Sequence, residues 1–99
     1  MEIKIQAIHF DATEKLQEFI DKKVTKLEKT FEDIQKVDVQ CKLVKPATAQ
    51  NKVVSMTVTV PGQTLFVEKT SDTFEESTDL CVDTMRVQLQ KFKEKLRDR

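Results

Sequence analysis

The chain has 99 residues, of which 38% are hydrophobic and 34% charged, and its 17 basic side chains balance 17 acidic ones. This length and composition are typical of one globular domain with a charged surface rather than of a disordered chain. Because no stretch approaches the roughly 20 apolar residues of a membrane span and the amino terminus lacks the apolar segment of a signal peptide, we expect one cytoplasmic domain over 1–99 without membrane contact.

The first half of the chain predicts a strand, a helix and a second strand. Apolar and polar residues alternate over 2–8, which is typical of a strand. Thr13 or Asp11 can cap the helix that follows, and apolar residues at helical spacing continue to about Asp33. The stripe that should face the core consists of Leu16, Phe19, Ile20, Val24, Leu27, Phe31 and Ile34. Alternation over 37–43 predicts the second strand.

The second half predicts a hairpin and a long helix. In chain order we expect a loop at 46–51, a strand near 52–60, a short turn at 61–63 and a fourth strand at 64–69. Ser71 or Asp72 should open the last helix, which continues to about Leu96. Its buried face should consist of Phe74, Thr78, Cys81, Met85, Leu89, Phe92 and Leu96.

The order β-α-β-β-β-α predicts an α+β fold. The first two strands should be parallel, with a right-handed crossover, and the later hairpins antiparallel. Because each helix has one apolar face, both helices should cover one side of a four-stranded mixed sheet. The other side offers at most Phe66 as an aromatic platform, so we do not expect nucleic-acid bases to stack there.

The residue types that form most catalytic sites are scarce in this chain. The only histidine is His9, which we expect to be structural, and the only glycine is Gly62. A metal site needs clustered ligands, and a phosphate-binding loop needs several glycines. We therefore predict no enzymatic activity, metal, cofactor or small-molecule substrate. Cys41 and Cys81 should be buried free thiols.

Charge is distributed unevenly despite the neutral total. At roughly 100° per helical residue, Lys15, Lys22, Lys26 and Lys29 fall within roughly 40° of one direction. In the last helix acidic groups gather in the first half and basic groups in the second, an order that the helix dipole favours by itself. One interpretation is a solvated surface with local ion pairs. The other is that two adjacent basic edges form one surface for the phosphates of structured RNA.

Several segments of the chain carry a resemblance to a known family. They are Met1–Ile5, His9–Ala12, Leu16–Glu28, Asp72–Glu76 and Gln88–Leu96. Together with the element order they resemble the ribosome hibernation-promoting factors, also called ribosome-associated inhibitor or sigma-54 modulation proteins. The resemblance spans essentially the whole chain. It implies a double-stranded-RNA-binding-like fold and a stress-response factor that inhibits translation by idle ribosomes.

The resemblance also implies a partner and a binding site. The partner is the small ribosomal subunit, with its rRNA, at the channel for mRNA and tRNA, so that 1–99 would be one ribosome-binding domain. Carried over position by position, the rRNA-binding residues are Lys22, Lys23, Lys26, Lys29, Arg86, Lys91, Lys93 and Lys95. Because the chain ends at Arg99, it resembles the short form of the family, without the C-terminal dimerisation domain.

Three positions depart from the family pattern. Relatives often carry a basic residue where this chain has Ile8, Val87 and Gln90. Val87 shares an exposed helix direction with Leu80, so a small apolar patch replaces part of the basic surface. The alternative function is therefore a protein-interaction or homodimerisation module that uses this patch, and self-association is left open.

Overall fold

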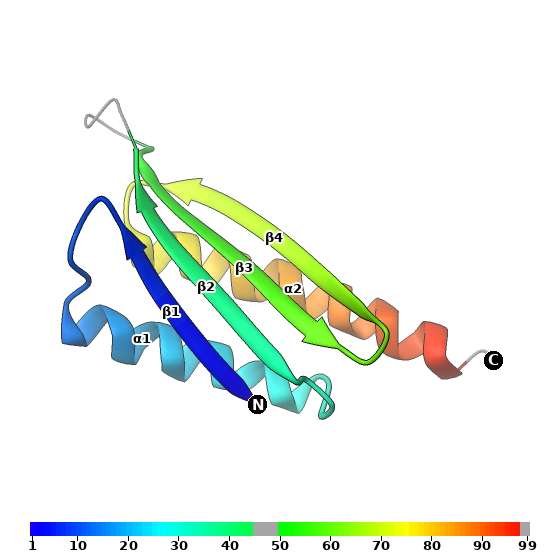
Figure 1. The fold of residues 1–99 in the computed structure, drawn as a ribbon. Coiled ribbons are helices and arrows are strands. Elements are labelled where there is room, and N and C mark those ends of the chain that lie inside the picture. The colour runs from blue at the N-terminus through cyan, green and yellow to red at the C-terminus, as the bar shows by residue number, and fades with distance from the viewer. Residues whose placement is uncertain (45–49, 98–99) are drawn as a thin grey trace.

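The described part of the chain forms a four-stranded sheet with two helices on one face. The computed structural model describes residues 1–44 and 50–97. Its elements are β1 (Glu2–Ile8), α1 (Glu14–Thr25), the 3-10 helix η1 (Lys26–Lys29), β2 (Lys36–Leu43), β3 (Lys52–Val60), β4 (Gln63–Ser71) and α2 (Phe74–Arg97). Both α-helices lie on the same side of the sheet (Figure 1). Of the loop predicted at 46–51, residues 46–49 lie outside the described residues.

The sheet has the order β1-β2-β3-β4. β1 and β2 are parallel, and the other neighbouring strands are antiparallel, as predicted. Ile5 pairs with Val39, which pairs in turn with Met56, so apolar side chains of three strands project from one face. This register puts the polar residues of each strand on the opposite face, where Phe66 is 58% exposed.

α1 begins as predicted but ends earlier. The Thr13 hydroxyl oxygen accepts a hydrogen bond from the Leu16 backbone N–H at 3.1 Å, so Thr13 is the N-cap. The expectation that the helix continues to Asp33 is wrong. After η1, the backbone N–H groups of Thr30 and Phe31 both donate to the Leu27 carbonyl, at 3.0 and 3.1 Å, and close the segment with a tight turn.

The α2 boundaries also differ from the sequence prediction. The Thr73 hydroxyl oxygen accepts a hydrogen bond from the Glu76 backbone N–H at 3.0 Å, so Thr73 is the N-cap rather than Ser71 or Asp72. Ser71 is instead the last residue of β4. Leu96 was expected to be buried, but it is 44% exposed. The reason is that the last turns of α2 extend past the β3–β4 turn, where no strand covers them (Figure 1).

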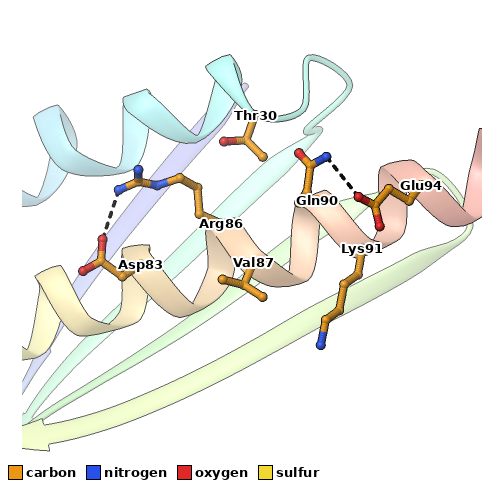
Figure 2. Close-up of a pocket in the computed structure, with 7 residues that line it drawn as sticks. All are labelled: Thr30, Asp83, Arg86, Val87, Gln90, Lys91 and Glu94. Carbon is orange, nitrogen blue, oxygen red and sulfur yellow. Dashed lines mark hydrogen bonds and ion pairs between the residues drawn. The ribbon is translucent and has the colours of Figure 1, made fainter.

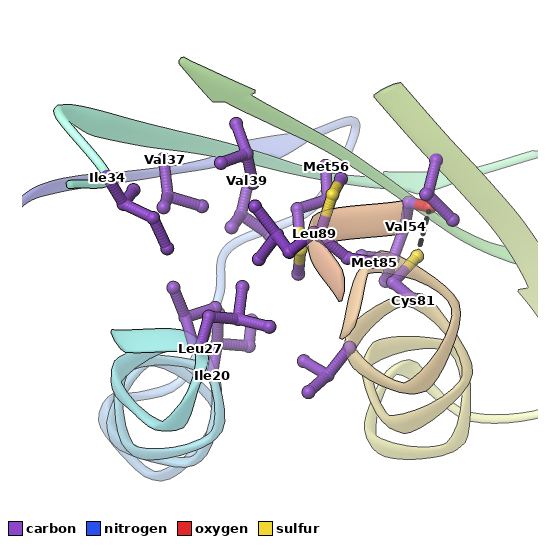
Figure 3. Packing of buried hydrophobic residues seen from close by; sticks show 14 of the residues in the cluster. Ile20, Leu27, Ile34, Val37, Val39, Val54, Met56, Cys81, Met85 and Leu89 are labelled. Atoms are coloured by element: carbon purple, nitrogen blue, oxygen red, sulfur yellow. Dashed lines mark hydrogen bonds between the residues drawn. The ribbon is translucent and has the colours of Figure 1, made fainter. Parts of the chain in front are cut away.

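The hydrophobic core fills the space between the sheet and the two helices (Figure 3). Among its fully buried side chains are Ile20, Leu27, Val39, Met56, Met85 and Leu89. Cys41 and Cys81 are buried free thiols, as predicted. Burial raises the pKa of Cys41 to about 11 and that of Cys81 to about 12. The Cys81 thiol lies 3.2 Å from the Val54 carbonyl oxygen, to which it donates.

Candidate nucleic-acid interface

α1 and α2 lie side by side and run in the same direction (Figure 1). An ion pair joins them, with the Lys23 ammonium 3.2 Å from Asp79 Oδ1. The same ammonium lies 5.4 Å from the centre of the Phe19 ring. η1 continues from the end of α1 alongside α2. Its basic residues therefore lie next to Arg86, in the middle of α2.

Basic residues of the two helical segments meet in a depression between η1 and α2. It is lined by Lys26 and Lys29 of η1, by Thr30, which follows η1, and by Arg86 of α2. A neighbouring depression contains both Lys29 and Lys93, together with the acidic residues Glu32 and Asp33. We call the surface formed by Lys26, Lys29, Thr30, Arg86 and Lys93 the basic groove.

The remaining basic residues of the predicted site lie elsewhere. Lys91 and Lys95 line a depression with Gln63 and Leu65, on the β4 side of α2. Figure 2 shows the Lys91 side chain pointing away from that of Arg86. Lys22 is exposed in the last turn of α1 and lines none of these depressions. The structure therefore brings together Lys26, Lys29 and Arg86, and it places Lys93 next to Lys29. Lys95 lies away from them, and the Lys91 side chain points away from Arg86.

Carboxylates neutralise part of the predicted site. Asp79 pairs with Lys23, and Asp83 Oδ1 lies 3.0 Å from an amino group of Arg86 (Figure 2). Within residues 1–44 and 50–97, the other basic residues of the predicted site form no ion pair. They are Lys22, Lys26, Lys29, Lys91, Lys93 and Lys95. The lysines of η1 are therefore available for an anionic ligand.

Neutral and acidic residues occupy the outer side of α2. Val87, which is 54% exposed, and Gln90 line a depression together with Asp83, Arg86, Lys91 and Glu94 (Figure 2). The Gln90 side-chain amide donates to Glu94 Oε1 at 3.4 Å. The charge of this depression is mixed because Asp83 and Glu94 offset Arg86 and Lys91. By contrast, basic residues and Thr30 alone line the depression between η1 and α2.

Sequence reasoning did not single out some residues of this site. Thr30 lines three of the depressions around the two helices, whereas the sequence predicts that it lies inside a longer helix. Asp79 and Asp83 are the carboxylates that pair with Lys23 and Arg86. The pair within α2 has i,i+3 spacing and was detectable in principle. The pair between helices depends on how α1 and α2 are rotated against each other, which spacing along one helix does not give.

The part of the chain that the structure describes contains neither a metal-binding cluster nor a membrane-spanning helix. No group of three or more His, Cys, Asp or Glu side chains there is arranged to hold a metal ion. No described helix has the length and apolar character needed to cross a membrane.

Solved structures define the class of fold. The ribosomal subunit interface protein from Coxiella burnetii is similar with a TM-score of 0.85 and 24% sequence identity, over 95% of this chain and 99% of that chain. The N-terminal domain of Thermus thermophilus Protein Y is similar with a TM-score of 0.79 and 19% identity, over 93% and 99% of the two chains. These similarities confirm the predicted α+β architecture.

The family follows from a match over almost the whole chain. The family model described as sigma 54 modulation protein / S30EA ribosomal protein matches residues 3–97. The chain belongs to this family, so the resemblance predicted from the sequence is confirmed. This is a family of ribosome-associated hibernation factors.

Proposed function

We propose that this protein is a ribosome hibernation factor that binds the small ribosomal subunit in the channel for mRNA and tRNA. It inhibits translation by idle ribosomes because it occupies that channel. The chain acts in the cytoplasm as a single ribosome-binding domain. Its mechanism is steric and electrostatic, without turnover. Family membership and the basic groove support this proposal.

The observation that carries the proposal is the convergence of Lys26, Lys29 and Arg86 in one depression. Lysine ammonium groups bind phosphate as point charges, and a guanidinium can bind it with two parallel hydrogen bonds. We propose that these three groups, which come from two segments, contact successive phosphates of an RNA backbone. Arg86 would contact a phosphate while its Asp83 pair is weakened or exchanged, because that pair lies on the surface.

The neutral net charge does not oppose RNA binding at this site. Glu76 and Arg86 are separated by about 15 Å along α2, at about 1.5 Å per residue. This separation exceeds the Debye length of about 8 Å at physiological ionic strength. A phosphate in the basic groove is therefore screened from the acidic first turns of α2. The local charge of the groove, rather than the total of the molecule, determines the attraction.

Co-sedimentation with purified small ribosomal subunits tests the proposal. We expect the double variant Lys26→Glu with Lys29→Glu to lose affinity by roughly tenfold or more, since two phosphate contacts become repulsive. The matched control is Lys4→Glu with Lys42→Glu. It changes the net charge equally, but at exposed positions on the outer face of the sheet. If both double variants bind equally well, the basic groove is not the contact.

An in vitro translation assay with the same proteins tests inhibition separately from binding. The wild type and the outer-face control should inhibit translation, and the groove variant should not. Binding without inhibition would contradict the proposed occupancy of the channel.

A further inference from the structure

The outward face of α2 carries exposed apolar side chains that no described element covers. Leu80 is 40% exposed and Val87 is 54% exposed. They are seven residues apart, so at roughly 100° per residue they point within roughly 20° of each other. Glu76 and Lys91 are exposed close to the same direction. This face has an apolar pair at its centre, an acidic end and a basic end.

The spacing of these residues is symmetric about the midpoint of Leu80 and Val87. Glu76 precedes Leu80 by four residues, and Lys91 follows Val87 by four. In a two-fold symmetric interface, a contact from residue i of one copy to residue j of the other is accompanied by the contact from residue j of the first copy to residue i of the second. Two antiparallel copies of α2 that cross at this midpoint would place Leu80 of each copy against Val87 of the other. The same register places Glu76 of each copy against Lys91 of the other.

The charge order of α2 favours this antiparallel pairing. Acidic residues occupy the first turn and basic residues the last. Antiparallel copies therefore bring opposite charges together, whereas parallel copies would bring like charges together. The equal numbers of basic and acidic residues remove net repulsion between copies. Asp83 lies near the two-fold axis, where its charge is compensated by Arg86 of its own helix at 3.0 Å.

We propose that a second copy of this chain docks antiparallel on the outward face of α2, with Leu80 and Val87 at the centre of the interface. Few apolar side chains take part, so the contact falls below the size of stable dimer interfaces and the dimer exchanges rapidly with monomer. The interface covers Lys91, which is one of the predicted rRNA-binding residues and lies outside the basic groove. Self-association therefore competes with ribosome binding at Lys91.

Sedimentation velocity over a protein concentration series tests the interface. The wild type should shift from monomer toward dimer as concentration rises, and Val87→Glu should stay monomeric. Glu76→Lys and Lys91→Glu should each weaken association, because each places like charges opposite one another. An equimolar mixture of these two variants restores both ion pairs, so it should associate at least as strongly as the wild type.

Two results would overturn this proposal. One is a wild type that remains monomeric at the highest concentration reached. The other is a mixture of the two charge variants that associates no better than either variant alone. Lys42→Glu, on the outer face of the sheet, is the control and should associate like the wild type. Far-ultraviolet circular dichroism establishes that each variant is folded, as expected for substitutions at exposed positions.

Discussion

The Lys23 ammonium lies 3.2 Å from Asp79 Oδ1 and connects α1 to α2. The two side chains are 31% and 48% exposed, so water screens their attraction and the pair contributes little to stability. The ion pair links the two helices one turn before η1, and Lys26 and Lys29 of η1 then lie next to Arg86.

Because Asp79 already neutralises Lys23, we expect Lys23 to contribute less to ribosome binding than Lys26. Lys23→Ala should change the free energy of unfolding in urea by less than about 1 kcal/mol. In co-sedimentation with small subunits, Lys23→Ala should bind more tightly than Lys26→Ala. Equal losses of affinity in these two variants would mean that the ion pair opens when the ribosome is bound.

The core should depend on Leu89 much more than on Leu96. Leu89 is fully buried between the sheet and α1, whereas Leu96 is 44% exposed at the end of α2. Leu89→Ala should lower the free energy of unfolding by about 2–5 kcal/mol, because it leaves a cavity. Leu96→Ala should lower it by less than about 1 kcal/mol. Urea unfolding of both variants measures the difference, and similar losses would place Leu96 in the core.

The buried thiols should make the protein less stable at alkaline pH. Burial raises the pKa of Cys41 from 9.0 to about 11, so the folded state holds its thiol proton at pH values where the unfolded state releases it. The free energy of unfolding should therefore fall as pH rises from about 9 to about 11. Cys41→Val, which has no thiol to ionise, is the matched comparison.

Urea unfolding at a series of pH values checks this prediction. The difference in unfolding free energy between wild type and Cys41→Val should be constant below pH 9 and should change in favour of the variant above it. A difference that stays constant up to pH 11 would show that the thiol ionises in the folded state as easily as in the unfolded one.

Restoring a basic residue at position 87 should strengthen ribosome binding. Val87→Arg adds a guanidinium on the outward face of α2, next to Arg86 and Lys91. If this side chain reaches a phosphate, the slope of log affinity against log salt should steepen by roughly 0.7–0.9. Val87→Gln is the control for loss of the apolar side chain. A slope that is equal in both variants would place position 87 outside the rRNA contact.

Most of the fold could be predicted because its local signals agree. Alternating apolar residues defined each strand, and the order of elements defined the sheet. The predicted end of α1 was wrong, because the backbone after Thr25 is not α-helical. Leu27, Phe31 and Ile34 nevertheless keep helical spacing, since all three are buried. Burial, rather than helix geometry, determines that spacing. The prediction that Leu96 is buried was wrong because apolar spacing along α2 does not reveal where the sheet ends.

The candidate site was only partly accessible from the sequence. Helical spacing groups basic residues on one helix, but it does not show which side of that helix faces its neighbour. As a result, the sequence groups Lys95 with Arg86 although Lys95 lies on the β4 side of α2. The meeting of Lys29 with Lys93 depends on the tertiary packing of η1 against α2. The assignment of all these residues to rRNA binding stays a prediction.

The salt dependence of small-subunit binding tests most directly whether Lys26 and Lys29 contact RNA phosphates in the basic groove. Affinity of the wild type and of Lys26→Ala with Lys29→Ala should be measured by co-sedimentation over a series of salt concentrations. We expect the slope of log affinity against log salt to be shallower in the variant by roughly 1.4–1.8, for two lost contacts. Equal slopes for the two proteins would contradict this expectation.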